Sequence, residues 1–150
     1  MKKYLILLAL AACNPQTSEN VVTNSADQTK QVAKKSVRAK LADKVNFAFD
    51  SSSLSYDAKQ DLLQTAAWLN RRGNSSKDLV IEGHCDERGT REYNLALGER
   101  RAYTVKKFLS QNGVSAKRLK TVSYGEEKPA AVGASEKAYA KNRRAELKVK

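Results

Sequence analysis

Residues 79–102 read LVIEGHCDERGTREYNLALGERRA, and this stretch decides the fold. Its first part alternates as a strand does, and the residues that share one side are Leu79, Ile81, Gly83 and Cys85. From about Thr90 to Asn112 the spacing becomes helical, and Gly113 follows as a stop. The expected inward stripe of this helix is Leu95, Ala102, Val105 and Leu109. A strand that passes into a helix through a dense polar turn is typical of a layered sheet-and-helix domain.

Further elements flank this unit on both sides. Val45, Phe47 and Phe49 predict a first strand, and Ser55 is the expected N-cap of a helix that ends near Gly73. The apolar stripe of that helix is expected to comprise Leu62, Leu63, Ala66, Ala67 and Leu69. Residues 119–124 and 145–149 predict two more strands, separated by a short helix over 135–141. We therefore expect one α+β domain over 45–150, a βαβαβαβ-like two-layer sandwich with helices on one face of a four-stranded mixed sheet.

The composition excludes several classes of protein. The chain has 150 residues and 29% charged residues, which is ordinary for a soluble domain and unlike a collagen-like chain or a multi-pass membrane protein. Two cysteines and one histidine are too few for a disulfide framework and unfavourable for a structural zinc site. The net charge of +12 favours an anionic partner.

The amino terminus has the layout of an export signal. Basic residues at Lys2 and Lys3 precede an apolar run from Leu5 to Ala12, which is too short to span a bilayer. The run ends in LAAC, which resembles the lipobox of bacterial lipoproteins and implies cleavage after residue 12 and acylation of Cys13. Because Asn14 follows the cysteine where inner-membrane lipoproteins often carry Asp, the outer membrane is the expected location. That address excludes a nucleic acid as the partner.

Residues 13–44 are expected to form the lipidated cysteine and a flexible linker. Small polar residues and lysines dominate this segment, and large apolar side chains are nearly absent. Such a segment cannot bury enough apolar surface to offset the entropy of ordering it.

The polar turn over 82–94 is the candidate functional site, and its residues leave four interpretations open. His84 and Cys85 could be a nucleophile pair, although neighbouring strand residues point to opposite faces. His84, Cys85, Asp86 and Glu87 could hold a metal, although no second ligand cluster accompanies them. The remaining interpretations are a ligand pocket lined by charges of both signs and a solvated loop with surface ion pairs.

Four motifs resemble one family. They are FAFDSSSL at 47–54, the long motif at 83–102, SYGE at 123–126 and NRRA at 142–145. In this order and spacing they are similar to the Pal family of peptidoglycan-associated lipoproteins, which carry an OmpA-like domain. The similarity covers about residues 45–150. Ala48 departs from the family's usual Asp, and Tyr56 departs from its usual Pro.

The resemblance implies a binding site for the meso-diaminopimelate of the peptidoglycan stem peptide. The free end of that residue is a zwitterion. The resemblance implies that Asp86 accepts a hydrogen bond from its ammonium and that Arg101 donates two parallel hydrogen bonds, in a fork, to its carboxylate. Asn94, Leu97 and Arg101 are spaced to share one helix face, with Leu97 on the ligand's methylene chain and Asn94 on its polar end. The residues expected to complete the site are Asp50, Ser51 and Arg143. No metal or cofactor is implied.

The function that this resemblance implies is a non-enzymatic tether between outer membrane and peptidoglycan. It also implies membership of the Tol-Pal system in envelope integrity and cell division, with TolB and other Tol proteins as partners. Three alternatives stay open. They are an OmpA-like wall anchor without Tol partners, an enzyme of wall turnover, and a basic domain held to an anionic polymer by charge alone.

Overall fold

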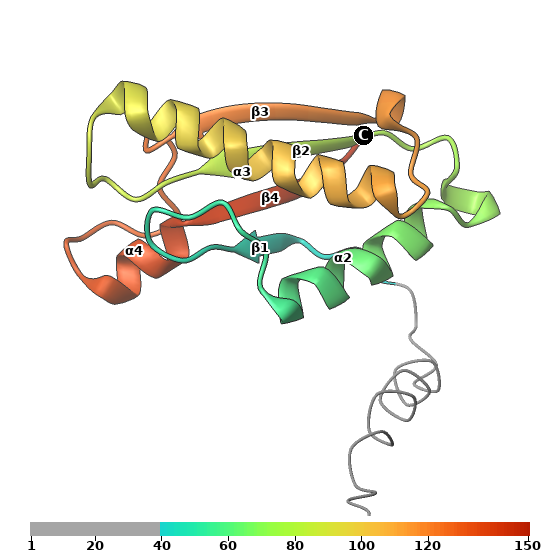
Figure 1. Ribbon diagram of the computed structural model, residues 1–150, viewed down its shortest axis with the longest axis horizontal. Helices are drawn as coiled ribbons and strands as arrows, with labels where there is room; N and C mark the ends of the chain where they lie inside the picture. Colours follow the sequence, from blue (N-terminus) through green and yellow to red (C-terminus); the bar gives the residue numbers. More distant parts are fainter. Residues whose placement is uncertain (1–39) are drawn as a thin grey trace, which may run out of the picture. The chain divides into compact units, whose positions relative to one another are not determined.

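The computed structural model describes residues 40–150, which form an α+β domain (Figure 1). The strands are β1 (Lys44–Asn46), β2 (Leu79–His84), β3 (Leu119–Gly125) and β4 (Arg144–Val149). The helices are α2 (Tyr56–Leu69), α3 (Arg91–Gln111) and α4 (Glu136–Asn142), with 3-10 turns η1 (Arg72–Asn74) and η2 (Ala116–Arg118). Within these residues, no helix combines the length and apolar character needed to cross a membrane. The predicted signal, Cys13 and most of the predicted linker lie outside the described residues.

The four strands form one mixed sheet in the order β1-β4-β2-β3. β4 pairs antiparallel with both β1 and β2, whereas β3 pairs parallel with β2. Helices α2 and α3 lie side by side over one face of this sheet, and α4 lies at its end beside the start of β4 (Figure 1). The predicted fold class is confirmed.

Each helix begins at a side-chain cap. The hydroxyls of Ser55, Thr90 and Ser135 accept from backbone N–H groups in the first turns of α2, α3 and α4. An acidic residue in each first turn also matches the positive end of the helix dipole. The starts of the helices are therefore encoded by local signals, which explains why they could be predicted. The predicted end of the first helix near Gly73 was wrong, because α2 ends at Leu69 and η1 occupies Arg72–Asn74.

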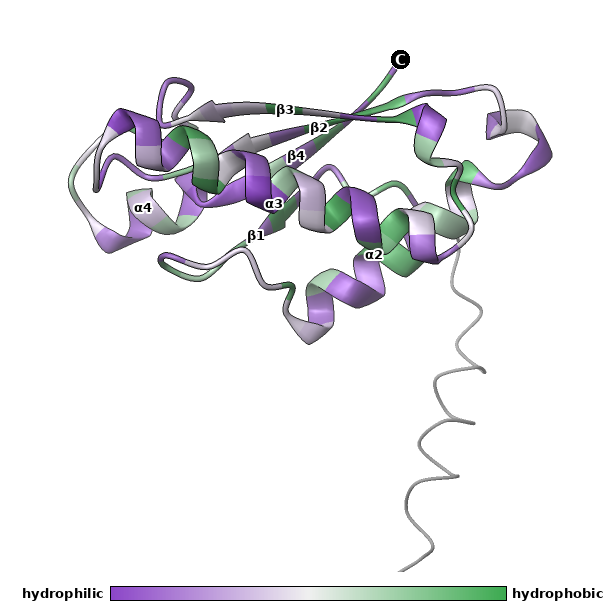
Figure 2. Ribbon diagram, turned by 45° about the horizontal axis from the view of Figure 1, so that its top comes forward, coloured by the Kyte–Doolittle hydropathy of each residue, from purple (hydrophilic) through white to green (hydrophobic). Residues whose placement is uncertain are grey.

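A single core lies between the sheet and the two long helices. Its fully or nearly fully buried members include Leu62, Leu69, Ile81, Val105, Leu109 and Leu147. In Figure 2 the hydrophobic part of α2 faces α3, whereas α3 carries several hydrophilic stretches along its length. Among the described residues, the members of this core and the partly buried residues packed on it run from Leu41 to Val149. Residues 40–150 therefore contain a hydrophobic core of their own and can fold as a unit.

The backbones of β2 and α3 touch where two glycines face each other. A Cβ placed on Gly83 would lie 1.8 Å from the carbonyl oxygen of Gly98. Only a residue without a side chain fits at Gly83, and this contact draws the start of α3 down onto the end of β2. The close approach fixes the geometry of the polar turn that joins the two elements.

The first strand is shorter than the sequence predicts. β1 ends at Asn46, Phe47 is buried beyond it, and Phe49 is 59% exposed. Beyond Asn46 the chain leaves the sheet and turns at Phe49 and Asp50, where Asp50 has a left-handed φ of 48°. The carbonyl oxygens of Ala48 and Ser51, on either side of this turn, accept from Arg101 of α3. The domain also begins before residue 45, since Leu41 packs on the core and Ala42 donates its N–H to Thr65.

Three predicted inward residues are instead at the surface, namely Leu63 and Ala67 on α2 and Leu95 on α3. Leu63 on α2 is 38% exposed and Leu95 on α3 is 42% exposed. On α3 the Gly83–Gly98 contact centres the buried face on Gly98, Arg101 and Val105, which leaves Leu95 on its flank. The apolar residues of α3 are compatible with either of two adjacent helix faces being buried. The prediction that Leu95 points inward was therefore wrong.

His84 lies on the sheet face away from α2 and α3 and is 1% exposed. Its ring stacks on Tyr124 with centroids 5.5 Å apart, and neither ring nitrogen has a hydrogen-bond partner among the described residues. Burial, with the nearby positive charge of Arg144, lowers the pKa of His84 from 6.5 to about 4. The folded domain therefore holds this histidine neutral.

Stability should consequently fall as the pH drops from 6.5 to about 4. The unfolded chain takes up a proton on His84 below pH 6.5 and the folded chain does not, so the loss approaches about 3 kcal/mol near pH 4. Urea unfolding at several pH values measures this slope. His84→Phe keeps a stacked ring without a titrating group and should flatten the slope over this window. Identical slopes for both proteins would contradict the assignment.

Candidate functional site

A pocket opens where the end of β2, the first half of α3 and the turn after β1 meet. It encloses about 190 Å³, and its lining residues are Phe49, Asp50, Cys85, Asp86, Arg88, Gly89, Tyr93, Asn94, Leu97 and Arg101. The pairing of β2 with β3 shifts register between Gly83 and His84, an irregularity that re-aims side chains at a strand end. Five of the seven residues predicted for ligand binding line this pocket. The other two, Ser51 and Arg143, contact it from behind.

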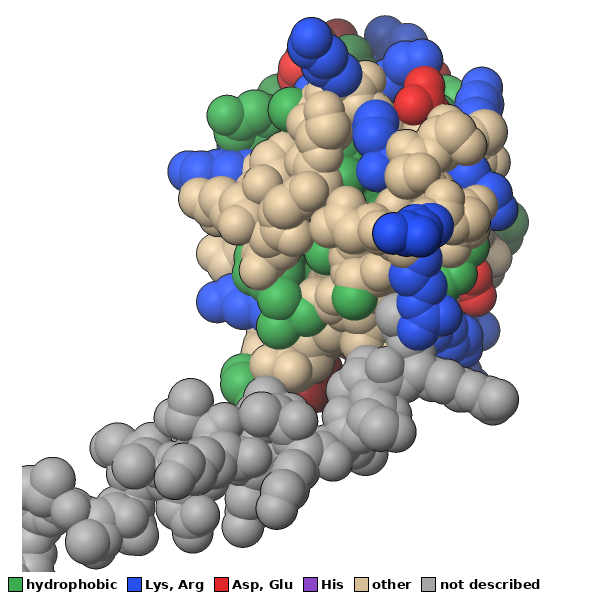
Figure 3. Space-filling view, turned by 90° about the vertical axis from the view of Figure 1, so that its right-hand side faces the viewer, with side chains coloured by type: hydrophobic (Ala, Val, Ile, Leu, Met, Phe, Trp, Pro, Cys, Tyr) green, Lys and Arg blue, Asp and Glu red, His purple; other side chains and the backbone are tan. Residues whose placement is uncertain are grey.

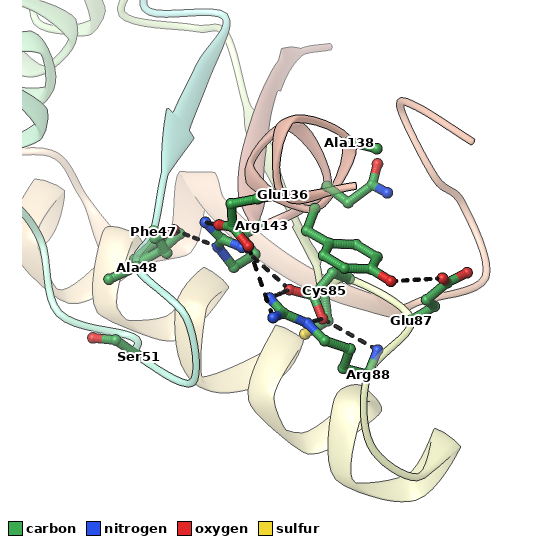
Figure 4. Close-up of polar contacts among 12 residues, drawn as sticks. Phe47, Ala48, Ser51, Cys85, Glu87, Arg88, Glu136, Ala138 and Arg143 are labelled. Carbon is green, nitrogen blue, oxygen red and sulfur yellow. Dashed lines mark hydrogen bonds and ion pairs between the residues drawn. The ribbon is translucent and has the colours of Figure 1, made fainter. Parts of the chain in front are cut away.

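Asp86 is the acidic centre of the pocket and is 4% exposed. Its Oδ1 accepts from the Nε of Arg88 at 3.1 Å, and its Oδ2 accepts from the Nη2 of Arg88 at 2.7 Å (Figure 4). Arg143 Nη1 lies 3.4 Å from the same Oδ2. Burial opposes ionisation, but the bonds from Arg88 and Arg143 outweigh it and hold the pKa of Asp86 below its ordinary value. The carboxylate is therefore charged throughout the neutral range.

Arg101 is the basic centre and is 1% exposed. Its guanidinium donates to the carbonyl oxygens of Ala48, Ser51 and His84 at 2.8–3.1 Å. A further N–H on Nη1 points to the sulfur of Cys85 at 3.4 Å. Four of its five N–H groups thus have partners within the domain, and one on Nη2 does not. Burial lowers the pKa of Arg101, but a guanidinium stays charged at physiological pH.

Asn94 and Leu97 lie on the same face of α3 as Arg101, as their spacing predicts. The Asn94 side-chain amide donates to the carbonyl oxygens of Asp86 and Arg88 and to the carboxylate of Glu126. This amide therefore holds the polar turn in shape. Leu97 is buried and gives the pocket an apolar wall.

Asp50 and Ser51 contribute in different ways. The Asp50 carboxylate accepts a short hydrogen bond from the Tyr93 hydroxyl, and both residues line the pocket. Ser51 offers its backbone carbonyl to Arg101, while its hydroxyl accepts from the N–H of Ser53. Ser51 therefore positions Arg101 through its backbone.

Arg143 lies behind Asp86 and is buried. Besides Asp86, it reaches the carboxylate of Glu136 at 2.7 Å and the carbonyl oxygen of Phe47 at 3.2 Å (Figure 4). Arg143 thus ties α4, the turn after β1 and Asp86 together. It is 7% exposed, and its side chain contacts Asp86 from the side away from the pocket lining.

Arg88 also lines the pocket, although sequence analysis predicted no binding role for it. Its guanidinium covers the Asp86 carboxylate and lies between two aromatic rings, 4.1 Å from the centroid of Phe49 and 4.4 Å from that of Tyr139. Such cation–π contacts favour a fixed position for the charge. The three residues come from separate parts of the chain, so spacing in the sequence could not reveal the arrangement.

The structure does not support the nucleophile and metal interpretations. Cys85 lines the pocket while His84 lies on the opposite sheet face, and burial raises the pKa of the Cys85 thiol. His84 therefore cannot activate Cys85. Possible metal ligands do cluster in the described region at Glu82, His84 and Glu146, which is not the predicted set. There the ammonium of Lys148 already contacts both carboxylates, at 2.6 and 3.2 Å.

The pocket presents charges of opposite sign beside an apolar wall. Asp86 and Asp50 offer carboxylate oxygens, Arg101 and Arg88 offer guanidinium groups, and Leu97 lies between the two α3 residues Asn94 and Arg101. A small zwitterion with a short aliphatic chain fits such a lining.

Comparison with known proteins identifies relatives over the same region. The model of a family described as the OmpA family matches residues 46–143. The peptidoglycan-associated lipoprotein of Haemophilus influenzae is 45% identical over 139 residues, which are 93% of this chain and 89% of the relative. That of Agrobacterium fabrum is 41% identical over 145 residues, covering 93% of this chain and 81% of the relative.

A solved structure has the same fold. The crystal structure of the peptidoglycan-associated lipoprotein from Burkholderia pseudomallei superposes with a TM-score of 0.69 and 42% sequence identity. The match covers 73% of this chain and 91% of that protein. The structural likeness thus falls on the domain that carries the pocket.

Proposed function

This chain belongs to the OmpA family, and we propose that it is a peptidoglycan-binding lipoprotein of the outer membrane. Like its relatives, it is a binding protein and not an enzyme. The observation that carries the proposal is the pocket in which Asp86 and Arg101, both almost fully buried, place opposite charges beside Leu97. The proposed ligand is the meso-diaminopimelate residue of the stem peptide, whose free end carries one ammonium and one carboxylate.

In this proposal the ligand's ammonium binds the Asp86 carboxylate. Both oxygens of Asp86 accept from Arg88, and Oδ2 also faces Arg143, so an incoming ammonium competes with the Arg88 guanidinium. Because Arg88 would lose its pairing with Asp86, this competition favours a ligand that brings its own anionic group to pair with Arg88. A ligand with both charges meets that requirement.

The ligand's carboxylate then accepts hydrogen bonds from the remaining N–H of Arg101 and from the N–H groups of Arg88 that the ammonium has displaced from Asp86. Arg101 alone cannot form the fork that the family resemblance implies, because its other N–H groups hold Ala48, Ser51, His84 and Cys85. Its role is to fix a buried positive charge at the pocket floor. Arg88, held between Phe49 and Tyr139, supplies the second guanidinium.

The membrane end of the tether is proposed to be the acylated Cys13. Each buried methylene of an acyl chain contributes about 0.8 kcal/mol, and two or more chains give a stable anchor. Cys13→Ala is therefore expected to move the protein from the membrane fraction to the soluble periplasmic fraction. A variant that still fractionates with membranes would show that Cys13 is not the anchor.

The proposal extends to the Tol-Pal system, with TolB and other Tol proteins as partners in envelope integrity and cell division. Its support is the similarity to peptidoglycan-associated lipoproteins alone. Recovery of TolB with the chain from detergent extracts would support this extension. Wall binding without TolB would favour the alternative, an OmpA-like wall anchor without Tol partners.

Co-sedimentation of residues 40–150 with purified sacculi tests the proposed function. The domain should pellet with the sacculi, release no soluble wall fragments, and be displaced by free diaminopimelate stem peptide. Release of fragments would indicate an enzyme of wall turnover. A domain that stays in the supernatant at low salt would contradict wall binding.

A further inference from the structure

The positive charge of the domain is concentrated at the end opposite the pocket. Residues 70–78 and 104–120 carry eight basic side chains and one acidic one, a net charge of +7. The rest of the described chain carries fourteen basic and thirteen acidic side chains, a net charge of +1. We call the first set the basic end; its members are Arg71, Arg72, Lys77, Lys106, Lys107, Lys117, Arg118 and Lys120.

The two segments of the basic end are held together by Arg118. Its guanidinium donates to the carbonyl oxygens of Leu69, Asn74 and Lys77, which joins η2 to the turn after α2. Among the described residues, only Lys120 of the basic end has an acidic partner, Asp78 at 3.3 Å. Figure 3 views this end of the domain, where blue side chains far outnumber red ones.

The fold itself accounts for little of this charge. The carboxyl ends of α2 and α3 both lie here and favour nearby cations. Each helix end carries roughly half a negative charge, so the two together balance about one unit. A net charge of +7 on mostly exposed side chains is far larger and repels itself, so an anionic partner would stabilise it.

The pocket can use little of this charge. From Arg101, the last α3 residue of the pocket lining, to the carboxyl end of α3 at Gln111 is ten residues, or about 15 Å at 1.5 Å per residue. The Debye length at physiological salt is about 8 Å, so the members of the basic end beyond α3 are largely screened from the pocket, and only Lys106 and Lys107 are nearer. The charges are also spread over the end of α3, the turn after α2, η2 and the start of β3, which suits an extended anionic face better than a small anion.

We propose that the basic end is a membrane-contacting surface that binds anionic phospholipid headgroups. The choice of a lipid surface rests on the proposed function, in which the chain is anchored in a membrane and grips the wall with its pocket. Contact through the basic end would turn the pocket away from the membrane, toward the peptidoglycan. Trp68, which is partly buried against the core, lies at the same end beneath the ammonium of Lys77, 5.0 Å from the ring centroid, and tryptophan favours membrane interfaces.

Vesicle co-sedimentation of residues 40–150 tests this proposal with two charge-matched variants. The first replaces Arg71, Arg72, Lys107 and Lys117 with Gln, and the second replaces Lys44, Lys59, Lys137 and Lys141 with Gln. All eight side chains are exposed, and none has an ion-pair partner within the described domain. Vesicles of phosphatidylglycerol with phosphatidylcholine are compared with phosphatidylcholine alone.

The unaltered domain should bind the anionic vesicles and not the neutral ones. At about 1 kcal/mol for each basic residue near an anionic surface, the first variant should lose about 100-fold or more in affinity. The second should lose less than about threefold, because its lysines lie outside the basic end. Both variants should still bind the diaminopimelate stem peptide, which separates this test from that of the pocket.

Three outcomes would overturn the assignment. No preference for anionic vesicles at low salt would mean that the basic end does not bind lipid. Equal losses in the two variants would mean that net charge alone drives adsorption. Tighter binding to dextran sulfate than to vesicles, lost in the first variant only, would identify a polyanion site and not a membrane surface.

Discussion

Asp86→Asn is expected to weaken binding of the diaminopimelate stem peptide by about 10- to 150-fold, since a hydrogen bond to a charged group contributes about 1.5–3 kcal/mol. The substitution keeps the shape of the side chain but removes the charge that would pair with the ligand's ammonium. Asp86 is almost fully buried, so little water could replace the lost interaction. Isothermal titration of residues 40–150 with the peptide measures the change.

Glu87→Gln is the matched control for Asp86→Asn. It removes the same charge one residue away, from an exposed carboxylate that accepts from the Tyr139 hydroxyl outside the pocket lining. Affinity should change by less than about twofold, as expected for an exposed charge. An equal loss in both variants would mean that net charge governs binding, and undiminished binding by Asp86→Asn would remove Asp86 from the site.

Gly83→Ala should be the most destabilising small substitution in the domain. Its Cβ would lie 1.8 Å from the Gly98 carbonyl oxygen, and backbone atoms on both sides cannot rotate away. Overpacking usually costs about 1–3 kcal/mol, and a backbone-on-backbone clash should cost at least the top of that range. Because domains of this size have about 5–15 kcal/mol of stability, the urea midpoint should fall sharply.

Two other glycines make this prediction specific. Gly73→Ala adds a Cβ with no atom within 4 Å and should leave stability unchanged or slightly raised. Gly98→Ala would meet the Ser123 hydroxyl at 2.4 Å, a contact that a side-chain rotation relieves in part, so it should fall between the two. A midpoint for Gly83→Ala within the range of Gly73→Ala would show that β2 and α3 are not in backbone contact.

The helices and strands could be predicted because their signals are local. Ser55, Thr90 and Ser135 each act as the N-cap. The alternation over 79–84 places Leu79 and Ile81 in the core, as expected for a strand under two helices. These features depend on residues three or four positions apart and need no knowledge of the rest of the chain.

The errors came from features that depend on distant residues. The sequence could not show that Gly98 meets Gly83 and so rotates α3, which left Leu95 on the flank. It also could not show that β1 ends at Asn46 and that the turn at Asp50 leaves Phe49 exposed beside Arg88. In both cases the local apolar pattern was present, and a long-range contact decided which side chain was buried.

The structure brings most of the predicted site residues together, but the contacts that each of them makes could not be predicted. Asp86, Asn94, Leu97 and Arg101 line one pocket, as the motif resemblance implied. Arg101 nevertheless donates most of its hydrogen bonds to backbone carbonyl oxygens. Residue spacing along a helix cannot predict these bonds, because the acceptors lie up to 53 residues away in the sequence. The contacts of Arg88 with Phe49 and Tyr139 could not be predicted from the sequence for the same reason.

Titration of residues 40–150 with two stem peptides tests the central claim most directly. One peptide carries meso-diaminopimelate, and the other carries Lys at that position, which keeps the ammonium but lacks the distal carboxylate. The pocket charges predict saturable binding of the first peptide with a preference of at least about tenfold, because a carboxylate paired with guanidinium groups is worth more than one kcal/mol. Equal affinity for both peptides, lost together at high salt, would contradict zwitterion recognition and leave charge alone as the link to the wall.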